Sequence, residues 1–549
     1  MVFSMQVARL LEYPTRMSSM SSQQISSVNV KPIRFLKRGE VVSLNNVPPS
    51  RTLLEALRED LCSTATKEGC GEGDCGACVV VLGEAVAGKV EFKAVNSCIR
   101  LAHSAHGMAV WTAEDIAAGG RPDAGPPQGG DGPLGGQRPA PAAERGGQRL
   151  HPAQEAMVQC HGSQCGFCTP GFVMSMFAMY QNHTAKGKAI SRELAQAELS
   201  GNLCRCTGYR PILDAAQMLD ALPSALLDES DLLQKLELLA EVNNRLEADL
   251  RPSTVNISAY SSPTTLKILL KTRAQHPNAQ IVAGTTDVGL WVTKQHRQFD
   301  QIIDVTKVAE LRRIEDYPHH IAIGAAVTLN DAFTALGKDR PQLKDFAARF
   351  AGLPVRNSGT LGGNVANGSP IGDSMPLLIA LGANVVLMSI RGHREMPLEQ
   401  LYTGYRQNVM AVDEVLAWIK VPKPTQGEFL RIYKISKRFD DDISAVCLGL
   451  NLRIADGIVV KASIGVGGVA ATPVRAIKTE AACLYKPWAR ATIEHAMTVL
   501  RAEFSPISDM RASSAYRTQV LGNLLQRYWL ESQGLQHINL ESFTLGSDQ

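Results

Sequence analysis

Residues 69–78 read Gly-Cys-Gly-Glu-Gly-Asp-Cys-Gly-Ala-Cys, and a fourth cysteine follows at Cys98. The cysteines of this stretch, Cys70, Cys75 and Cys78, form a C-x4-C-x2-C pattern. With a remote fourth cysteine, this is the ligand spacing of a plant-type [2Fe-2S] cluster. The glycines let the backbone wrap closely and direct N–H groups at the cluster sulfurs. A zinc site is the alternative, although zinc sites usually combine two short C-x2-C pairs.

A second quartet of cysteines has a different spacing. Cys165 and Cys168 form a C-x2-C pair, and Cys204 and Cys206 form a C-x-C pair. Each pair precedes a predicted helix, so two helix N-termini would converge on one anionic cluster. The first pair alone also fits a thioredoxin-like dithiol, but the downstream pair favours a second cluster. Two clusters on one chain indicate an electron-transfer protein. Four cysteines remain, and we interpret them as buried or incidental thiols: Cys62, Cys160, Cys447 and Cys483.

Length and charge narrow the class of protein. A chain of 549 residues suggests three or four domains. A net charge of +3 gives no reason to expect nucleic acid or a membrane as a partner, and no apolar run approaches the roughly 18 residues of a membrane span. Residues 1–27 lack the pattern of a signal peptide and predict a disordered N-terminus, with a transit peptide as the alternative. The size of the chain and the close cysteine pairs favour the cytoplasm over a disulfide-forming compartment.

Local patterns divide the chain into segments. Residues 28–115 predict a β-grasp ferredoxin domain, with two strands within 28–44, a helix over 51–61, and strands at 79–82 and 90–95. Residues 116–150 form a Gly/Pro-rich linker or the product of a frame-shift, since half of residues 119–150 are Gly or Pro. Residues 151–222 predict a helical domain whose helices begin near Pro170, Ser191 and Pro211. Residues 223–252 predict a linker helix.

The C-terminal half predicts a mixture of strands and helices in two parts, 253–424 and 425–549. Strands are expected at 281–282, 302–305, 321–323, 385–388 and 458–464, the last followed by a glycine bend at 465–468. Two G-x-G-x-x-G/A strings, at 130–135 and 465–470, do not predict a Rossmann fold. The first follows no strand, and Pro473 breaks the helix that should follow the second.

Two longer strings carry a family resemblance. Residues 162–171 read GSQCGFCTPG and residues 202–211 read NLCRCTGYRP. Together they resemble the helical two-iron domain of the molybdenum hydroxylases, the family of xanthine dehydrogenase, aldehyde oxidase and carbon monoxide dehydrogenase. The domain order resembles the small subunit of bacterial xanthine dehydrogenases. The resemblance implies a multidomain α+β fold: a β-grasp [2Fe-2S] domain, a helical [2Fe-2S] domain, and a two-lobed FAD-binding domain of the PCMH type with a C-terminal α+β lobe.

The resemblance also implies an FAD site. Residues 281–288 and 360–364 are small-residue segments that, taken alone, fit ordinary turns as well as phosphate-binding loops. Both resemble the FAD-binding loops of the family, as does the segment 369–373. The implied FAD contacts are Ile281, Val282, Ala283, Gly284, Thr285, Thr286, Asp287, Val288, Phe350, Thr360, Leu361, Gly362, Gly363, Asn364, Asp373, Leu416 and Lys434.

The function implied by the resemblance is electron transfer in the oxidation of hypoxanthine and xanthine to urate. A partner large subunit would carry molybdopterin, in an α2β2 heterotetramer. Its electrons would pass through the second-quartet cluster, then the first-quartet cluster, to FAD and NAD+. No catalytic residue is expected on this chain, and NAD+ comes from the resemblance alone. The alternatives are a related hydroxylase acting on aldehydes or N-heterocycles, and a zinc-binding module without enzyme activity.

Overall fold

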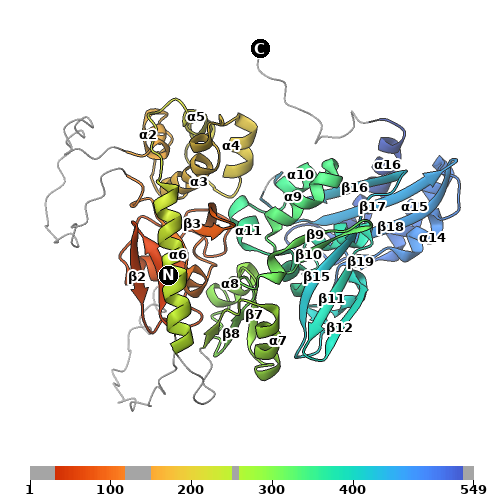
Figure 1. The fold of residues 1–549 in the computed structure, drawn as a ribbon. Coiled ribbons are helices and arrows are strands. Elements are labelled where there is room, and N and C mark those ends of the chain that lie inside the picture. The colour runs from red at the N-terminus through yellow and green to blue at the C-terminus, as the bar shows by residue number, and fades with distance from the viewer. Residues whose placement is uncertain (1–30, 118–149, 250–258, 440, 536–549) are drawn as a thin grey trace, which may run out of the picture.

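A computed structural model describes residues 31–117, 150–249, 259–439 and 441–535 (Figure 1). The predicted disordered N-terminus and almost all of the Gly/Pro-rich linker lie outside the described residues, as does the glycine string at 130–135. Of the helices in the described part, none has both the length and the apolar content that membrane crossing requires.

The first domain is a five-stranded sheet in the order β2-β1-β5-β3-β4, with β1 and β5 parallel. Its strands are β1 (Ile33–Lys37), β2 (Glu40–Leu44), β3 (Val79–Val86), β4 (Lys89–Asn96) and β5 (Ala109–Trp111). The helix predicted over 51–61 is shorter than expected: α1 covers only Leu53–Glu55, and a π-helical turn follows. In that turn the N–H of Leu61 bonds Ala56 five residues back, which keeps Leu57 buried as the chain leaves the helix.

The second domain consists of four α-helices, three of them packed around the central helix α3. The helices are α2 (Pro152–Gln159), α3 (Thr169–Asn182), α4 (Arg192–Leu199) and α5 (Arg210–Gln217). Phe177 of α3 lies 6.0 Å from Trp111 of the first sheet, between ring centroids, so the two domains share one apolar core. Helix α6 (Glu229–Asp249) lies along the first domain and buries Leu232 and Leu236 in that core (Figure 1).

Residues 259–535 form three larger sheets and one two-stranded sheet, β13 (Tyr402–Gly404) with β14 (Gln407–Asn408), with flanking helices. A parallel sheet, β6-β8-β7, is followed by an antiparallel sheet, β12-β11-β15-β10-β9, and then by the sheet β16-β17-β18-β19. The strands of the first two are β6 (Tyr260–Ser261), β7 (Gln280–Val282), β8 (Ile302–Asp304), β9 (Ile314–Asp316), β10 (His320–Gly324), β11 (Asn384–Ser389), β12 (Gly392–Pro397) and β15 (Val415–Pro422). The third sheet contains β16 (Glu428–Ile435), β17 (Val446–Ala455), β18 (Ile458–Gly467) and β19 (Val474–Arg475).

Helices cover these sheets. The helices of the first two sheets are α7 (Leu266–Gln275), α8 (Thr286–Thr293), α9 (Leu329–Asp339), α10 (Lys344–Ala348), α11 (Leu353–Ser358) and α12 (Leu361–Asn367). Helix α13 (Ser374–Leu381) packs mainly on β17 and β18 of the third sheet. The third sheet carries α14 (Ile477–Cys483), α15 (Arg490–Glu503) and α16 (Ser514–Ser532). The predicted multidomain α+β fold is therefore confirmed.

The glycine bend predicted at 465–468 is wrong in its position. Strand β18 continues through Gly467, and the left-handed residue is Gly468, with φ +82°. Helix α13 packs on this strand so closely that a Cβ on Gly465 would lie 2.1 Å from the Pro376 carbonyl oxygen. Glycine is therefore needed here for close packing of helix on strand rather than for a turn.

Residues 259–535 pack against both cysteine-bearing domains (Figure 1). Arg312 forms a bidentate ion pair with Glu84 of β3, at 2.6 and 2.8 Å. The side-chain amide of Asn357 donates to the Ala94 carbonyl at 3.0 Å. A Cβ on Gly352 would lie 2.4 Å from the Cα of Gly201 in the helical domain. These contacts fix how the predicted cluster sites lie relative to the predicted flavin site.

Candidate iron–sulfur and flavin sites

The first cysteine quartet (Cys70, Cys75, Cys78 and Cys98) lies in a largely enclosed loop. Cys78 and Cys98 are buried, and their sulfurs lie 3.3 Å apart. The thiol of Cys70 contacts those of Cys75 and Cys98, and it accepts hydrogen bonds from the N–H groups of Glu72 and Cys75 at 3.4 Å. These contacts hold the pKa of Cys70 far below its usual range. The same contacts with Cys70 raise the pKa values of Cys75 and Cys98, so one readily ionised thiol lies among neighbours that keep their protons.

The second quartet (Cys165, Cys168, Cys204 and Cys206) lies at the surface of the helical domain. Cys165 and Cys206 are exposed and contact each other, and Cys168 contacts Cys204. Burial, followed by the contact with Cys204, raises the pKa of Cys168 to about 12. As the sequence predicted, the cysteines gather where α3 and α5 begin, since Cys168 is the residue before α3 and Tyr209 the residue before α5.

The sulfurs of the first quartet form one connected group, whereas those of the second approach one another in two pairs. Among the described residues, no three or more His, Cys, Asp and Glu side chains gather in the arrangement of a single-ion site. A two-iron cluster binds four cysteine sulfurs that lie close together, and each quartet supplies four. Both donor sets consist of thiolate sulfur alone, the ligand that iron–sulfur clusters take. The residues present therefore fit two [2Fe-2S] clusters.

Hydrogen bonds to backbone carbonyl groups connect the loops that carry the two quartets. The N–H of Leu203, the neighbour of Cys204, donates to the carbonyl of Cys75 at 2.9 Å. The side-chain amide of Asn202 donates to the carbonyl of Gly76 at 3.1 Å. A Cβ on Gly171 at the start of α3 would lie 2.1 Å from the same Gly76 oxygen. Glycine at both positions thus allows the two cysteine loops to touch.

A cavity of about 400 Å3 lies where β7 ends and α8 and α12 begin. Eleven of the seventeen residues predicted to contact FAD line it: Ile281, Ala283, Thr285, Thr286, Asp287, Val288, Thr360, Gly362, Gly363, Asn364 and Leu416. Three others lie between these residues in the sequence but do not line the cavity. Val282 and Leu361 are buried in apolar clusters, and Gly284 packs against the backbone of Ser358. The segment 360–364 is a helix start rather than a loop, because Thr360 caps α12 by accepting a hydrogen bond from Gly363 N–H at 2.9 Å.

The segment 281–288 packs closely against the chain just before the segment 360–364, and a glycine permits this contact. Gly284 has φ +85°, and a Cβ there would lie 1.7 Å from the carbonyl oxygen of Ser358. The following residue, Thr285, is also left-handed, at φ +60°. Its buried hydroxyl has no hydrogen-bond partner among the described residues, and it borders the cavity at the N-terminus of α8. A buried hydroxyl at a helix N-terminus fits an anionic group such as a pyrophosphate. The cavity thus fits the predicted FAD.

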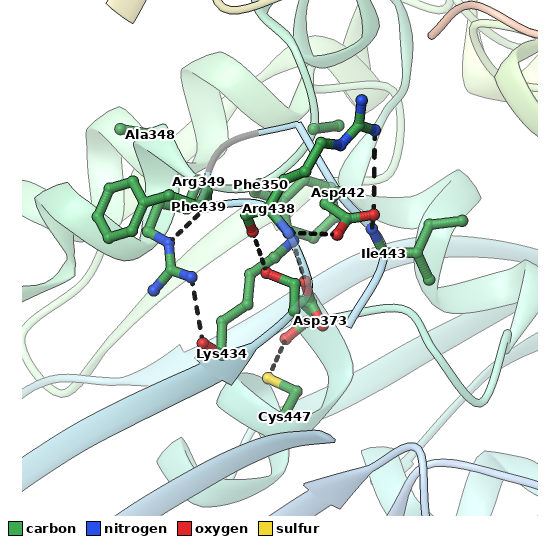
Figure 2. Close-up of polar contacts among 12 residues, drawn as sticks. Ala348, Arg349, Phe350, Asp373, Lys434, Arg438, Phe439, Asp442, Ile443 and Cys447 are labelled. Carbon is green, nitrogen blue, oxygen red and sulfur yellow. Dashed lines mark hydrogen bonds and ion pairs between the residues drawn. The ribbon is translucent and has the colours of Figure 1, made fainter. Parts of the chain in front are cut away.

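The remaining predicted contacts, Phe350, Asp373 and Lys434, form a second group outside the lining of this cavity (Figure 2). The Lys434 ammonium lies 2.8 Å from one carboxylate oxygen of Asp373, and both side chains are buried. The other oxygen of Asp373 is buried and has no hydrogen-bond partner among the described residues. Arg349 donates to the carbonyls of Phe439 and Lys434, at 2.9 and 3.2 Å. The role of this group in FAD binding remains a prediction.

Arg438 connects this group to the first cysteine loop. Its guanidinium lies 3.5 Å from Asp74 and donates to the carbonyl of Asp441 at 2.8 Å. Asp441 is buried, and burial together with the negative charge of Asp74 raises its pKa to about 7, against the opposing charge of Arg438. The neighbouring Asp442 has a lowered pKa: burial would raise it, but hydrogen bonds from the N–H groups of Arg438 and Ile443 outweigh that effect.

The sequence did not predict several residues that line the cavity. Trp291 lies one helical turn after Asp287 on α8, so its i, i+4 spacing would have revealed it if 286–293 had been recognised as a helix. Asn408 and Glu414 come from a distant part of the chain, and no local pattern marks them. Burial raises the pKa of Asp287 in this cavity, against the opposing charge of Arg406.

Comparison with known proteins identifies each domain. Residues 36–102 match the 2Fe-2S iron-sulfur cluster binding domain, and residues 142–217 match the [2Fe-2S] binding domain. Residues 254–424 match the FAD binding domain in molybdopterin dehydrogenase, and residues 431–532 match the CO dehydrogenase flavoprotein C-terminal domain.

Several relatives are similar along most of this chain. A xanthine dehydrogenase of Drosophila pseudoobscura pseudoobscura is 33% identical over 93% of the chain, and a xanthine dehydrogenase/oxidase of Gallus gallus is 29% identical over 85%. The chain spans only 40% and 37% of the lengths of these two relatives. A solved carbon monoxide dehydrogenase from Hydrogenophaga pseudoflava covers 49% of this chain and 94% of its own, with 27% identity and a TM-score of 0.47.

Two [2Fe-2S] domains followed by an FAD-binding domain define the chain as an iron–sulfur flavoprotein, a class of oxidoreductase that transfers electrons. The chain belongs to the xanthine dehydrogenase/molybdenum hydroxylase family, of which it forms the iron–sulfur and FAD part.

Replacing Gly284 should weaken FAD binding. In Gly284→Ala, a left-handed alanine that also presses on the Ser358 carbonyl costs about 2–3 kcal/mol, so we expect roughly 30- to 150-fold weaker FAD binding. The measurement is FAD and iron content of the purified protein. Gly337→Ala on α9, where a Cβ meets nothing within 4 Å, is the matched control and should retain FAD. Equal FAD content in the two variants would contradict the role of this loop.

Replacing Asp441 should stabilise the protein above neutral pH. An unfolded Asp441 ionises near pH 3.8 and the folded one near pH 7, so folded-state stability falls as pH rises between these values. Asp441→Asn removes that loss and should add on the order of 4 kcal/mol at pH 8, and much less at pH 4. Thermal unfolding at both pH values measures this. Asp442→Asn, at a site of lowered pKa, should instead destabilise at pH 8. A gain from Asp441→Asn that is independent of pH would refute the explanation.

Proposed function

We propose that this chain is the electron-transfer part of a xanthine dehydrogenase. Electrons from a molybdopterin centre on a partner large subunit would pass through two [2Fe-2S] clusters to FAD and then to NAD+, during oxidation of hypoxanthine and xanthine to urate. The observation that carries the proposal is the hydrogen bond from Leu203 N–H to the Cys75 carbonyl. Leu203 precedes Cys204 of the second quartet, and Cys75 belongs to the first, so this bond brings the two quartets close together. An electron relay requires such closeness.

The chain would hold its cofactors with the residues described above. Cys70, Cys75, Cys78 and Cys98 would bind one cluster, and Cys165, Cys168, Cys204 and Cys206 the other. When bound, the clusters carry single electrons and FAD collects two, which suits a nicotinamide acceptor. The FAD pyrophosphate would lie against Thr285 and the start of α8, and the buried Asp373–Lys434 pair would contact the same cofactor. No side chain of this chain is proposed to act on the purine.

The exposure of the second quartet supports a partner at that face. Cys165 and Cys206 are exposed, whereas Cys78 and Cys98 of the first quartet are buried. A centre on another subunit can therefore approach the second quartet, and we propose a molybdopterin-binding large subunit there, in an α2β2 assembly.

Cys75→Ser tests the order of the centres. The variant should lose the first-quartet cluster and reduce its FAD slowly with substrate, while direct reduction of FAD by NADH stays at the parent rate. Iron and sulfide analysis and stopped-flow flavin absorbance measure these effects. Cys62→Ser, at an exposed cysteine outside both quartets, is the control and should retain all activities. Loss of NADH-driven reduction in a variant that retains FAD would contradict the order, and a colourless, zinc-containing parent would contradict the function.

Isolation of the native complex tests the partner and the substrate. We expect this chain to co-purify with a molybdenum-containing subunit and to oxidise hypoxanthine and xanthine with NAD+. A panel of purines, aldehydes and N-heterocycles, each assayed with NAD+ and with oxygen, measures the specificity. Preferred oxidation of aldehydes or N-heterocycles would replace the proposed substrate with that of a related hydroxylase. A complex without molybdenum would refute the assignment of the partner.

A further inference from the structure

Helix α8 contacts the flavin cavity with its first turn and the first cysteine loop with its last. Thr286, Asp287 and Val288 line the cavity. The helix is eight residues long, which corresponds to about 12 Å at 1.5 Å per residue. The two predicted cofactor sites are thus separated by little more than this one helix.

The middle of α8 lies directly on the first quartet. A Cβ on Gly289 would lie 2.2 Å from the carbonyl oxygen of Ile99, the residue after Cys98. One residue later, Leu290 packs against the apolar cluster that includes Cys78 and Cys98. Glycine at 289 therefore permits a helix-to-backbone contact, and any shift of α8 would also displace the cysteine loop.

The end of α8 is hydrogen-bonded to the same loop. The Thr293 hydroxyl lies 2.7 Å from the carbonyl oxygen of Gly71, to which it donates. The Lys294 ammonium donates to the carbonyl of Cys70, and its Nζ lies 3.9 Å from the Glu72 carboxylate. Both partners lie in the segment of the loop that begins with the ligand Cys70.

The charge of Lys294 has an electrostatic consequence. The C-terminal end of a helix carries partial negative charge, and here it faces a site for an anionic cluster. A [2Fe-2S] cluster on four thiolates is negative when oxidised and gains one further negative charge when reduced. A nearby ammonium group offsets the partial negative charge at the helix end. It also stabilises the reduced cluster more than the oxidised cluster. The Glu72 carboxylate, 3.9 Å from the ammonium, acts on the cluster in the opposite direction.

We infer that Lys294 is a positioning residue that raises the reduction potential of the first-quartet cluster, and that α8 sets the spacing between this cluster and FAD. The inference rests on the proposed function, since it assigns a cluster to the first quartet and FAD to the cavity. Lys294 acts through the Cys70 carbonyl and through its charge, and it does not bind either cofactor.

The test is a redox titration of the intact complex followed by electron paramagnetic resonance, with the first-quartet signal assigned by its loss in Cys75→Ser. Lys294→Gln keeps a hydrogen-bond donor and removes the charge. We expect a roughly tenfold shift of its reduction equilibrium toward the oxidised form, about 59 mV lower for one electron. The second-quartet signal should keep the parent potential, and Lys294→Arg should restore the first to near the parent value. Lys271→Gln, at an exposed lysine on α7, is the matched control and should shift neither signal.

Two results would overturn the inference while leaving the proposed function intact: an unchanged first-quartet potential in Lys294→Gln with full iron and FAD content, or an equal shift in Lys271→Gln. Parent protein that shows neither cluster signal would overturn the proposed function and, with it, this inference.

Discussion

The loop that carries Cys70, Cys75 and Cys78 is held by hydrogen bonds from two other domains, and the arrangement of the sites depends on this. The helical domain contributes the N–H of Leu203, and the flavin domain contributes the side chains at the end of α8. A Cβ on Gly76 would lie 2.3 Å from the carbonyl oxygen of Gly201, so this approach requires a residue without a side chain. Because hydrogen-bonded contacts of this kind have narrow distance limits, they fix the relative positions of the three predicted cofactor sites.

The two quartets lie in different environments, and each environment suits its place in the proposed order. The first lies between domains, with two buried and two half-buried cysteines. The second lies at the surface, where a centre on another subunit can approach it. Electron transfer through packed protein needs sites that lie close together and no moving parts. The proposed series meets this need: it has one exposed end, and its other end is a cavity for a two-electron carrier.

Sequence reasoning succeeded where chemistry lies within a short segment. The ligand spacings around Cys70 and Cys165 indicated clusters, and the resemblance of 281–288 and 360–364 to the FAD-binding loops of the family implied a flavin site. Eleven of the seventeen residues that it implied line one cavity. It failed where a residue's environment comes from elsewhere. Gly465 looked like a bend, yet it serves packing beneath α13. The segment 360–364 looked like a loop, although the Thr360 side chain caps a helix.

The sequence by itself indicated the iron–sulfur clusters, because cluster ligands recur at characteristic short spacings that survive without knowledge of the fold, and its resemblance to the molybdenum hydroxylases implied FAD. Only the tertiary structure decided which sites touch. The Thr293 hydroxyl reaches the Gly71 carbonyl across 222 residues of chain, and the Leu203 N–H reaches Cys75 from another domain. Such contacts depend on how whole surfaces fit together, and no local periodicity encodes them.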